Sequence, residues 1–171
     1  MERQPSFSPD GSQVAFSWDG EKQDNFDIYV KMIGSGTPLR LTTHASLDFS
    51  PAWSPDGRQI AFLRVLPDGR AAVLVIPALG GSERKLAESS PQYDFQDDTP
   101  LSGLGWSPDS KWIAFSIRDS PAEPNALFLL SLETGERRRL TTPPPNSAGD
   151  GTPAFSPDGR TLVFSRGGVI M

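Results

Sequence analysis

The stretch Pro51-Ala-Trp-Ser-Pro-Asp-Gly57 occurs four times in this chain with small changes. The other copies are Pro5-Ser-Phe-Ser-Pro-Asp-Gly11, Leu104-Gly-Trp-Ser-Pro-Asp-Ser110 and Pro153-Ala-Phe-Ser-Pro-Asp-Gly159. Intervals of 46, 53 and 49 residues separate their aromatic residues, which are Phe7, Trp53, Trp106 and Phe155. A period of roughly 40–50 residues is typical of stacked supersecondary units, so this repeat predicts the fold. We expect the four aromatic residues to lie in the core.

Each copy predicts a tight β-hairpin. A second aromatic residue follows the first by nine positions, at Phe16, Phe62, Phe115 and Phe164, and closes a short apolar run typical of a strand. The Ser-Pro-Asp-Gly link suits a tight turn, because proline presets φ and glycine accepts a positive φ. Ser110 replaces that glycine in the third copy, so this turn is either looser or strained by up to about 1 kcal/mol.

Two further apolar runs complete each unit. The third run lies 22 residues after the first aromatic, at Tyr29, Val75 and Phe128, and the fourth ends at Leu41, Leu86 and Leu140. We therefore expect four strands, A to D, in each unit, near 5–8, 13–17, 27–32 and 38–42 in the first one. A meander that is apolar on both faces needs neighbouring sheets. The predicted fold class is all-β, a β-propeller of four-stranded antiparallel blades.

The repeat divides residues 1–171 into three complete blades and a half blade of one partial propeller domain. The predicted blades span about 5–42, 51–87 and 104–142, and the half blade spans 153–166. Because closed propellers have about four to eight blades, this ring is incomplete. We expect a fragment of a larger propeller protein. The alternative is a homodimer in which a second copy completes the propeller.

The phrases 51–62 (Pro-Ala-Trp-Ser-Pro-Asp-Gly-Arg-Gln-Ile-Ala-Phe) and 27–30 (Asp-Ile-Tyr-Val) resemble the TolB-like β-propeller repeat, a relative of WD-repeat blades. The resemblance recurs four times and covers almost the whole chain. It implies part of a bacterial protein: a periplasmic Tol–Pal component, a prolyl-oligopeptidase-like or tricorn-like peptidase, or a transcriptional regulator or kinase with a propeller. A TolB-like parent would imply a periplasmic location, whereas the sequence itself leaves the compartment unknown.

Composition restricts the classes of function. The chain has no cysteine, which excludes disulfides and thiolate metal sites. Its apolar stretches are far shorter than the roughly 20 residues that span a membrane, so we expect no membrane insertion of this segment. A net charge of −5 argues against direct nucleic-acid binding. The basic run Arg137-Arg138-Arg139 is expected on a solvated hairpin with some acidic partners.

Catalytic residues are not expected in this chain. His44 is the only histidine, and the sequence contains no Gly-x-Ser-x-Gly nucleophile elbow. No glycine-rich phosphate loop follows a predicted strand. We therefore predict no enzymatic activity and no cofactor.

Binding is expected on the face formed by the B–C loops and the D–A loops. Strand D is followed by the next strand A aromatic after 12, 20 and 15 residues, and loops that vary in length are where binding is usually built. The loops of this face comprise roughly 17–27, 42–51, 63–71, 87–103, 116–125 and 141–152.

This face is predicted to be acidic and to carry aromatic side chains. Asp48 and Asp150, each five residues before a strand A aromatic, are the candidate metal ligands. The candidate partner-binding residues are Trp18, Asp48, Tyr93, Asp94, Phe95, Asp97, Asp98 and Asp150. A ring of carboxylates can bind a cation or a basic peptide, but solvation and local turns account for them more simply. The aromatic residues either anchor a partner or cap the blade packing.

The preferred hypothesis is a non-catalytic TolB-like β-propeller module that binds a protein or peptide, or acts as a sensor. The alternative is the substrate-gating propeller of a prolyl-oligopeptidase-like serine peptidase whose catalytic domain lies outside this chain. A third hypothesis is a cation- or glycan-binding propeller.

Overall fold

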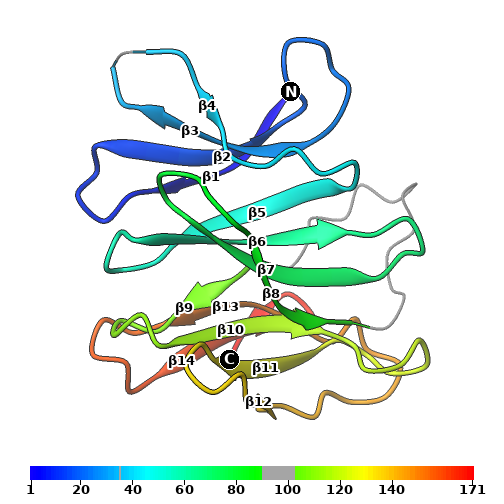
Figure 1. Cartoon of the computed structure of the whole chain (residues 1–171). Helices are drawn as coiled ribbons and strands as arrows, with labels where there is room; N and C mark the ends of the chain where they lie inside the picture. Colours follow the sequence, from blue (N-terminus) through cyan, green and yellow to red (C-terminus); the bar gives the residue numbers. More distant parts are fainter. Residues whose placement is uncertain (35, 90–102) are drawn as a thin grey trace.

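Four antiparallel sheets follow one another along the chain (Figure 1) in the computed structural model, which describes residues 1–34, 36–89 and 103–171. All regular secondary structure in these ranges is β-strand, which confirms the all-β propeller fold. The first two sheets contain β1 (Glu2–Phe7), β2 (Gln13–Trp18), β3 (Asp27–Met32), β4 (Leu39–Arg40), β5 (Leu47–Trp53), β6 (Gln59–Val65), β7 (Ala71–Pro77) and β8 (Arg84–Glu88). The last two contain β9 (Gly105–Trp106), β10 (Trp112–Ile117), β11 (Ala126–Ser131), β12 (Arg137–Arg139), β13 (Asp150–Phe155), β14 (Leu162–Arg166) and β15 (Val169–Ile170).

Strand A starts earlier than predicted in blades 1, 2 and 4. Its proline was expected to open the strand, yet β1, β5 and β13 begin several residues before it. Each of these strands has a bulge just before the proline, where the pairing register shifts. The residue preceding the proline there has a positive φ: 54° at Gln4, 53° at Ser50 and 48° at Thr152. A bulge leaves one residue unpaired, which is why a proline is tolerated inside these strands.

Two further expectations are corrected. The last sheet has a third strand, because β15 pairs with β14, so it extends beyond the predicted end at residue 166. In blade 2, Leu74 lies opposite Phe62, in the position that Tyr29 and Phe128 occupy opposite Phe16 and Phe115. Val75 was predicted there, but the short loop 66–70 shifts the register by one residue. A one-residue shift moves a side chain to the other face of the sheet.

The core lies between successive blades. One cluster joins Ile28 and Val30 of blade 1 to Phe62 and Leu74 of blade 2. The other joins the opposite face of blade 2 to blade 3, and its members include Leu63, Val73, Val75, Phe115 and Phe128. Blade 2 is therefore covered on both faces, as the two-sided apolar pattern predicts.

The strand A aromatic of each blade packs against the preceding blade. Trp53 is 8% exposed and Trp106 is 9% exposed, and the indole nitrogen of Trp106 donates a hydrogen bond to the Ala52 carbonyl oxygen at 2.9 Å. Phe7 is 64% exposed, because no other sheet formed by the described residues packs on that face of blade 1. The prediction that all four aromatics are core is therefore wrong for Phe7, and Phe155 is only half-buried.

The Ser-Pro-Asp-Gly hairpins are held by the same hydrogen bonds in all four copies. The serine hydroxyl donates to the aspartate carboxylate at 2.6 Å in each, and that carboxylate also accepts a backbone N–H two residues later. In the first copy the hydrogen bond from Ser8, with those from Ser12, lowers the pKa of Asp10 to about 2. The turn is therefore an ordered local unit and needs no support from a neighbouring blade.

Ser110 keeps the hairpin geometry of the glycine that it replaces. Its φ is 59°, and its N–H donates to the Ser107 carbonyl at 2.9 Å, as the N–H of Gly57 does to Ser54. The turn is thus strained and not looser. Its hydroxyl accepts a hydrogen bond from the Asp56 N–H at 3.0 Å, which links the hairpins of blades 2 and 3 and offsets part of the strain.

Gly105 allows strands β9 and β13 to approach closely. A Cβ atom at this position would lie 2.6 Å from the carbonyl oxygen of Pro153. We expect Gly105→Ala to lower the free energy of unfolding by about 1–3 kcal/mol, because blades 3 and 4 would have to move apart. Urea denaturation checks this. Gly103→Ala is the matched control, since nothing lies within 4 Å of its added Cβ atom. Equal effects of the two substitutions would contradict the close approach.

Candidate functional site

Among the described residues, the predicted binding face contains two buried carboxylates where exposed ones were expected. Asp48 lies near the start of β5 and Asp150 begins β13, and they are 0% and 2% exposed. Trp18, at the end of β2, is half-buried. The other predicted residues, Tyr93, Asp94, Phe95, Asp97 and Asp98, lie outside the described residues.

Asp48 is bound by a buried arginine. Arg64 of β6 donates from Nε to one carboxylate oxygen of Asp48 at 2.7 Å and from Nη2 to the other at 2.8 Å. The same guanidinium contacts Glu83 at 2.7 Å and 3.0 Å. Burial raises the pKa of the Asp48 carboxyl, and the hydrogen bonds from Arg64 oppose that rise. With both oxygens of Asp48 engaged by a cation, this carboxylate is not available as a metal ligand or partner contact.

The fourth blade repeats this arrangement. Arg166 of β14 donates to the two carboxylate oxygens of Asp150 at 2.6 Å and 2.8 Å. Burial alone would raise the pKa of Asp150, but hydrogen bonds from Arg166 and Thr141 bring it below its ordinary value. The expectation that Asp48 and Asp150 are open candidate ligands is therefore replaced by a structural role, in which each ties strand A to strand B of its blade.

Backbone hydrogen bonds extend these ties to the preceding blade. The N–H of Asp48 donates to the Phe26 carbonyl at 2.8 Å, and the N–H of Asp150 donates to the Asn125 carbonyl at 2.7 Å. Phe26 and Asn125 both directly precede a third strand. The ends of the strands on this face are thus fixed within and between blades.

A third buried carboxylate, Asp27, was not identified from the sequence. It is 0% exposed, forms an ion pair with Arg40, and accepts a hydrogen bond from the Thr42 hydroxyl at 3.1 Å. The same hydroxyl oxygen accepts the N–H of Ile28 at 2.9 Å, and Thr141 does this for Leu127 in blade 3. The sequence carries a signal for such pairs, because Arg64 follows Asp48 and Arg166 follows Asp150 by the same 16 residues.

Trp18 belongs to an aromatic cluster on blade 1. Its ring centroid lies 4.9 Å from that of Tyr29 and 6.5 Å from that of Phe16. By register Trp18 occupies the position of Arg64 in blade 2, opposite Glu2 where Arg64 faces Asp48. An aromatic side chain therefore occupies this position in blade 1, whereas blades 2 and 4 have an ion-paired arginine there.

The basic run 137–139 forms strand β12, the outer strand of blade 3. Arg137 contacts Asp119 at 3.0 Å, and Arg139 contacts Glu123 at 3.2 Å. The two guanidinium groups also lie over the ring of Phe128. The expected solvated hairpin with acidic partners is confirmed.

His44 is engaged in its own loop. Its Nδ1 accepts a hydrogen bond from the Ser46 N–H at 2.9 Å, so this nitrogen is not directed at a nucleophile. No group of three or more potential metal ligands gathers within residues 1–34, 36–89 and 103–171. Over the same ranges, no helix is long and apolar enough to cross a membrane.

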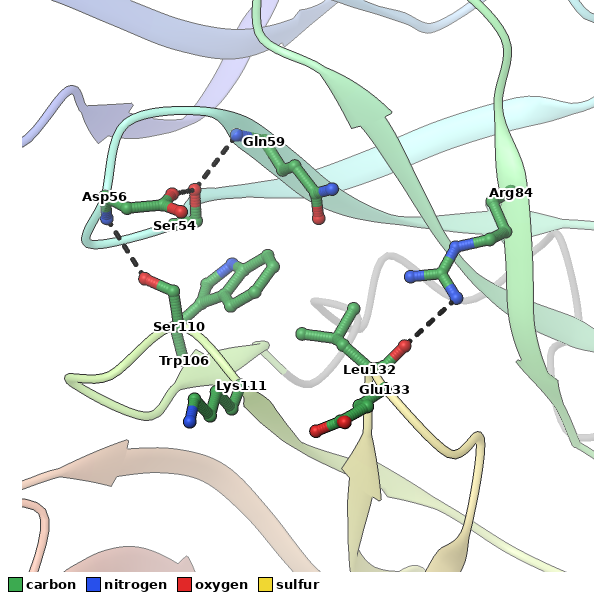
Figure 2. A pocket seen from close by; sticks show the side chains of 9 residues that line it. All are labelled: Ser54, Asp56, Gln59, Arg84, Trp106, Ser110, Lys111, Leu132 and Glu133. Carbon is green, nitrogen blue, oxygen red and sulfur yellow. Dashed lines mark hydrogen bonds between the residues drawn. The ribbon is translucent and has the colours of Figure 1, made fainter.

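A pocket opens on the opposite face, among the Ser-Pro-Asp-Gly hairpins. Figure 2 shows this cavity of about 280 Å³ between blades 2 and 3, with Trp106 and Leu132 on one side and Gln59 and Arg84 on the other. No binding site was predicted here from the sequence, because the prediction relied on loops that vary in length and these hairpins have the same length in all four copies.

Comparisons with known proteins identify the family. The family described as the TolB beta propeller domain matches residues 1–102, more than half of the chain. This chain belongs to the TolB beta propeller domain family. TolB from Acinetobacter baumannii has the same fold, with a TM-score of 0.75 at 19% identity over 96% of this chain and 37% of that one.

Two bacterial relatives of this TolB-type propeller are named as peptidases. The uncharacterized peptidase YuxL of Bacillus subtilis is 33% identical over 161 residues, which cover 94% of this chain and 21% of YuxL. Dipeptidyl-peptidase 5 of Porphyromonas gingivalis is 30% identical over 146 residues, which cover 80% of this chain and 20% of that enzyme. The chain thus spans about a fifth of the length of these two relatives.

The buried ion pair between Asp48 and Arg64 is expected to be a major stabilising contact of this TolB-type propeller. Asp48→Asn should lower the free energy of unfolding by about 3 kcal/mol, since it leaves the buried guanidinium of Arg64 with Glu83 as its one remaining carboxylate partner among the described residues. Chemical denaturation monitored by tryptophan fluorescence measures this. Glu123→Gln is the control, because its pair with Arg139 is exposed and should contribute less than about 1 kcal/mol. A cost below 1 kcal/mol for both would contradict the assigned role.

Proposed function

We propose that this chain is a non-catalytic TolB-like propeller module that binds a protein or peptide on the face formed by its B–C and D–A loops, which we call the loop face. The module would belong to a larger bacterial protein such as a transcriptional regulator or kinase. The observation that carries this proposal is the contrast between fixed strand ends and variable loops on that face. Asp48 and Asp150 lock the strand ends, while the D–A loop has six residues after blade 1, 41–46, and ten after blade 3, 140–149. Binding residues are commonly carried by loops that a rigid scaffold positions.

The charge of the exposed loop residues favours a basic partner. With Asp48 and Asp150 buried, the exposed carboxylates on this face include Glu21 and Asp24 in the first B–C loop, whereas Asp68 in the second is exposed but pairs with Arg70. The whole chain carries a net charge of −5. Complementary charge gives specificity and faster association more than raw affinity, so a transient interaction with a basic peptide segment suits this surface.

A second candidate function is the substrate-gating propeller of a prolyl-oligopeptidase-like serine peptidase. The names of YuxL and dipeptidyl-peptidase 5 favour it, because both are called peptidases and this chain matches only part of each. In that case the propeller would contact peptide substrates but would not supply the nucleophile. Both candidates assign polypeptide recognition, and not chemistry, to this chain.

Selection from a random phage-displayed peptide library tests the loop-face proposal. We expect enriched peptides to be basic, and Glu21→Lys to reduce their affinity at least fivefold by reversing the local charge. Glu136→Lys, in the turn between β11 and β12 on the opposite face, is the matched control and should leave binding unchanged. The purified chain should hydrolyse neither peptide nor ester substrates. Activity lost on His44→Ala, or peptides equally sensitive to both lysine variants, would overturn the proposal.

We also propose that a further blade of the same repeat covers the outer face of blade 1. Phe7 is 64% exposed there, whereas its counterparts Trp53 and Trp106 are buried by the preceding blade. Gly11 has no atom within 4 Å of an added Cβ, whereas the equivalent Gly57 packs on Pro9 of the preceding hairpin. When this chain is purified by itself, a second copy takes that place and presents the outer face of its last sheet.

The purified chain should therefore associate with itself through the Phe7 face. Light scattering after size exclusion should show a discrete dimer, because the face that a blade normally covers is open. Phe7→Ser should shift the population to monomer. Leu79→Ser is the control, since Leu79 is 88% exposed in the turn between β7 and β8 of blade 2. A monomer at every concentration, or equal effects of the two variants, would contradict this interface.

A further inference from the structure

The pocket between blades 2 and 3 is a preformed opening. Two hydrogen bonds between the blades frame it: Asp56 N–H to the Ser110 hydroxyl at 3.0 Å, and Arg84 Nη1 to the Leu132 carbonyl at 3.2 Å. Both bonds and the opening between them are visible in Figure 2. The lining residues lie on hairpins and strand ends held by their own hydrogen bonds. A ligand would therefore pay little to order the site.

One wall of the pocket is apolar. Trp106 offers only its ring surface, because its indole N–H is used by the Ala52 carbonyl and the residue is 9% exposed. Leu132 lies beside it as a partly buried residue that packs on the core. A flat aromatic surface next to an aliphatic side chain suits the apolar part of an amino-acid residue.

Arg84 dominates the polar side of the pocket. Its guanidinium has five N–H donors, and the hydrogen bond to Leu132 uses one of them. Arg84 forms no ion pair among the described residues. By register it is the counterpart of Arg138 in blade 3, since Arg84 lies opposite Val75 and Arg138 opposite Leu129. An arginine with free donors beside an apolar wall is suited to bidentate binding of a carboxylate.

The charged residues that line the pocket balance one another: Arg84 and Lys111 are positive, and Asp56 and Glu133 are negative. The Asp56 carboxylate accepts hydrogen bonds from Ser54 and from the N–H of Arg58 within its own hairpin. Lys111 and Glu133 form no ion pair within the described ranges. Recognition of a carboxylate in this pocket therefore depends on the free donors of Arg84 and not on a net positive charge.

We propose that this pocket binds a peptide carboxylate, with Arg84 taking the carboxylate and the adjoining apolar side chain resting on Trp106 and Leu132. A volume of about 280 Å³ accommodates one or two residues and not a folded partner. The site lies on the face that carries the Ser-Pro-Asp-Gly hairpins, which we call the hairpin face. Its test is therefore independent of the test of the loop-face proposal.

The test uses N-acetyl-Ala-Leu with a free carboxylate and the same peptide as its carboxamide. Each is titrated into the isotope-labelled chain, and the indole N–H signal of Trp106 is followed by NMR. The free acid should shift this signal with a dissociation constant on the order of 1 mM, because it makes one charged contact and one small apolar contact. The carboxamide should shift it at least tenfold less at the same concentration.

Three variants sharpen the result. Arg84→Gln should weaken binding of the free acid about tenfold, whereas Arg138→Gln, at the equivalent position of blade 3, should change it less than twofold. Glu133→Gln should strengthen binding about twofold by removing a like charge. A thermal midpoint of Arg84→Gln close to that of the unmodified chain excludes misfolding. Equal shifts by acid and carboxamide, undiminished binding in Arg84→Gln, or no shift up to 10 times the expected dissociation constant would overturn the proposal.

Discussion

The packing of one sheet face on the next is the constraint on which the rest of the structure depends. Each blade is apolar on both sides, so its strands are stable only where a neighbour covers them. Blade 2, with Phe62 on one face and Val75 on the other, is covered by a neighbouring blade on each side. It contributes more buried apolar residues than any other blade. Fully burying one such side chain contributes about 1.5–3 kcal/mol.

That constraint separates the two faces of the propeller. On the hairpin face, Ser-Pro-Asp-Gly turns are stabilised locally and vary little between blades. On the loop face, the strand ends are tied by Asp48 with Arg64 and by Asp150 with Arg166, and the loops beyond them vary in length. Charged groups are buried in pairs here because an unpaired buried charge would be costly. Asp48 and Asp150, which the sequence suggested as members of an acidic ring, are parts of the scaffold in the structure.

Small departures from the repeat decide where recognition can occur. Ser110 accepts strain at a glycine position and gains a bond to the neighbouring hairpin. Arg84 lies where blade 1 has Leu39, so a guanidinium with free donors lies beside Trp106 and Leu132 at the seam between blades 2 and 3. Each copy of a repeat is a control for the others, and differences between copies are the features that packing alone does not explain.

The sequence by itself determined the fold class, the four hairpins and most strand positions, because the repeat spacing and the Ser-Pro-Asp-Gly turns are local signals. It did not determine that Asp48 and Asp150 are buried, because residues 16 positions apart meet only through strand pairing. It did not determine which face of the sheet Val75 occupies, because that depends on a one-residue difference in the pairing register of blade 2. It did not determine the exposure of Phe7 either, because that depends on which sheet packs on blade 1. The pocket beside Trp106 was beyond sequence reasoning for the same reason: its walls come from two blades, and only tertiary packing brings Arg84 and Leu132 together.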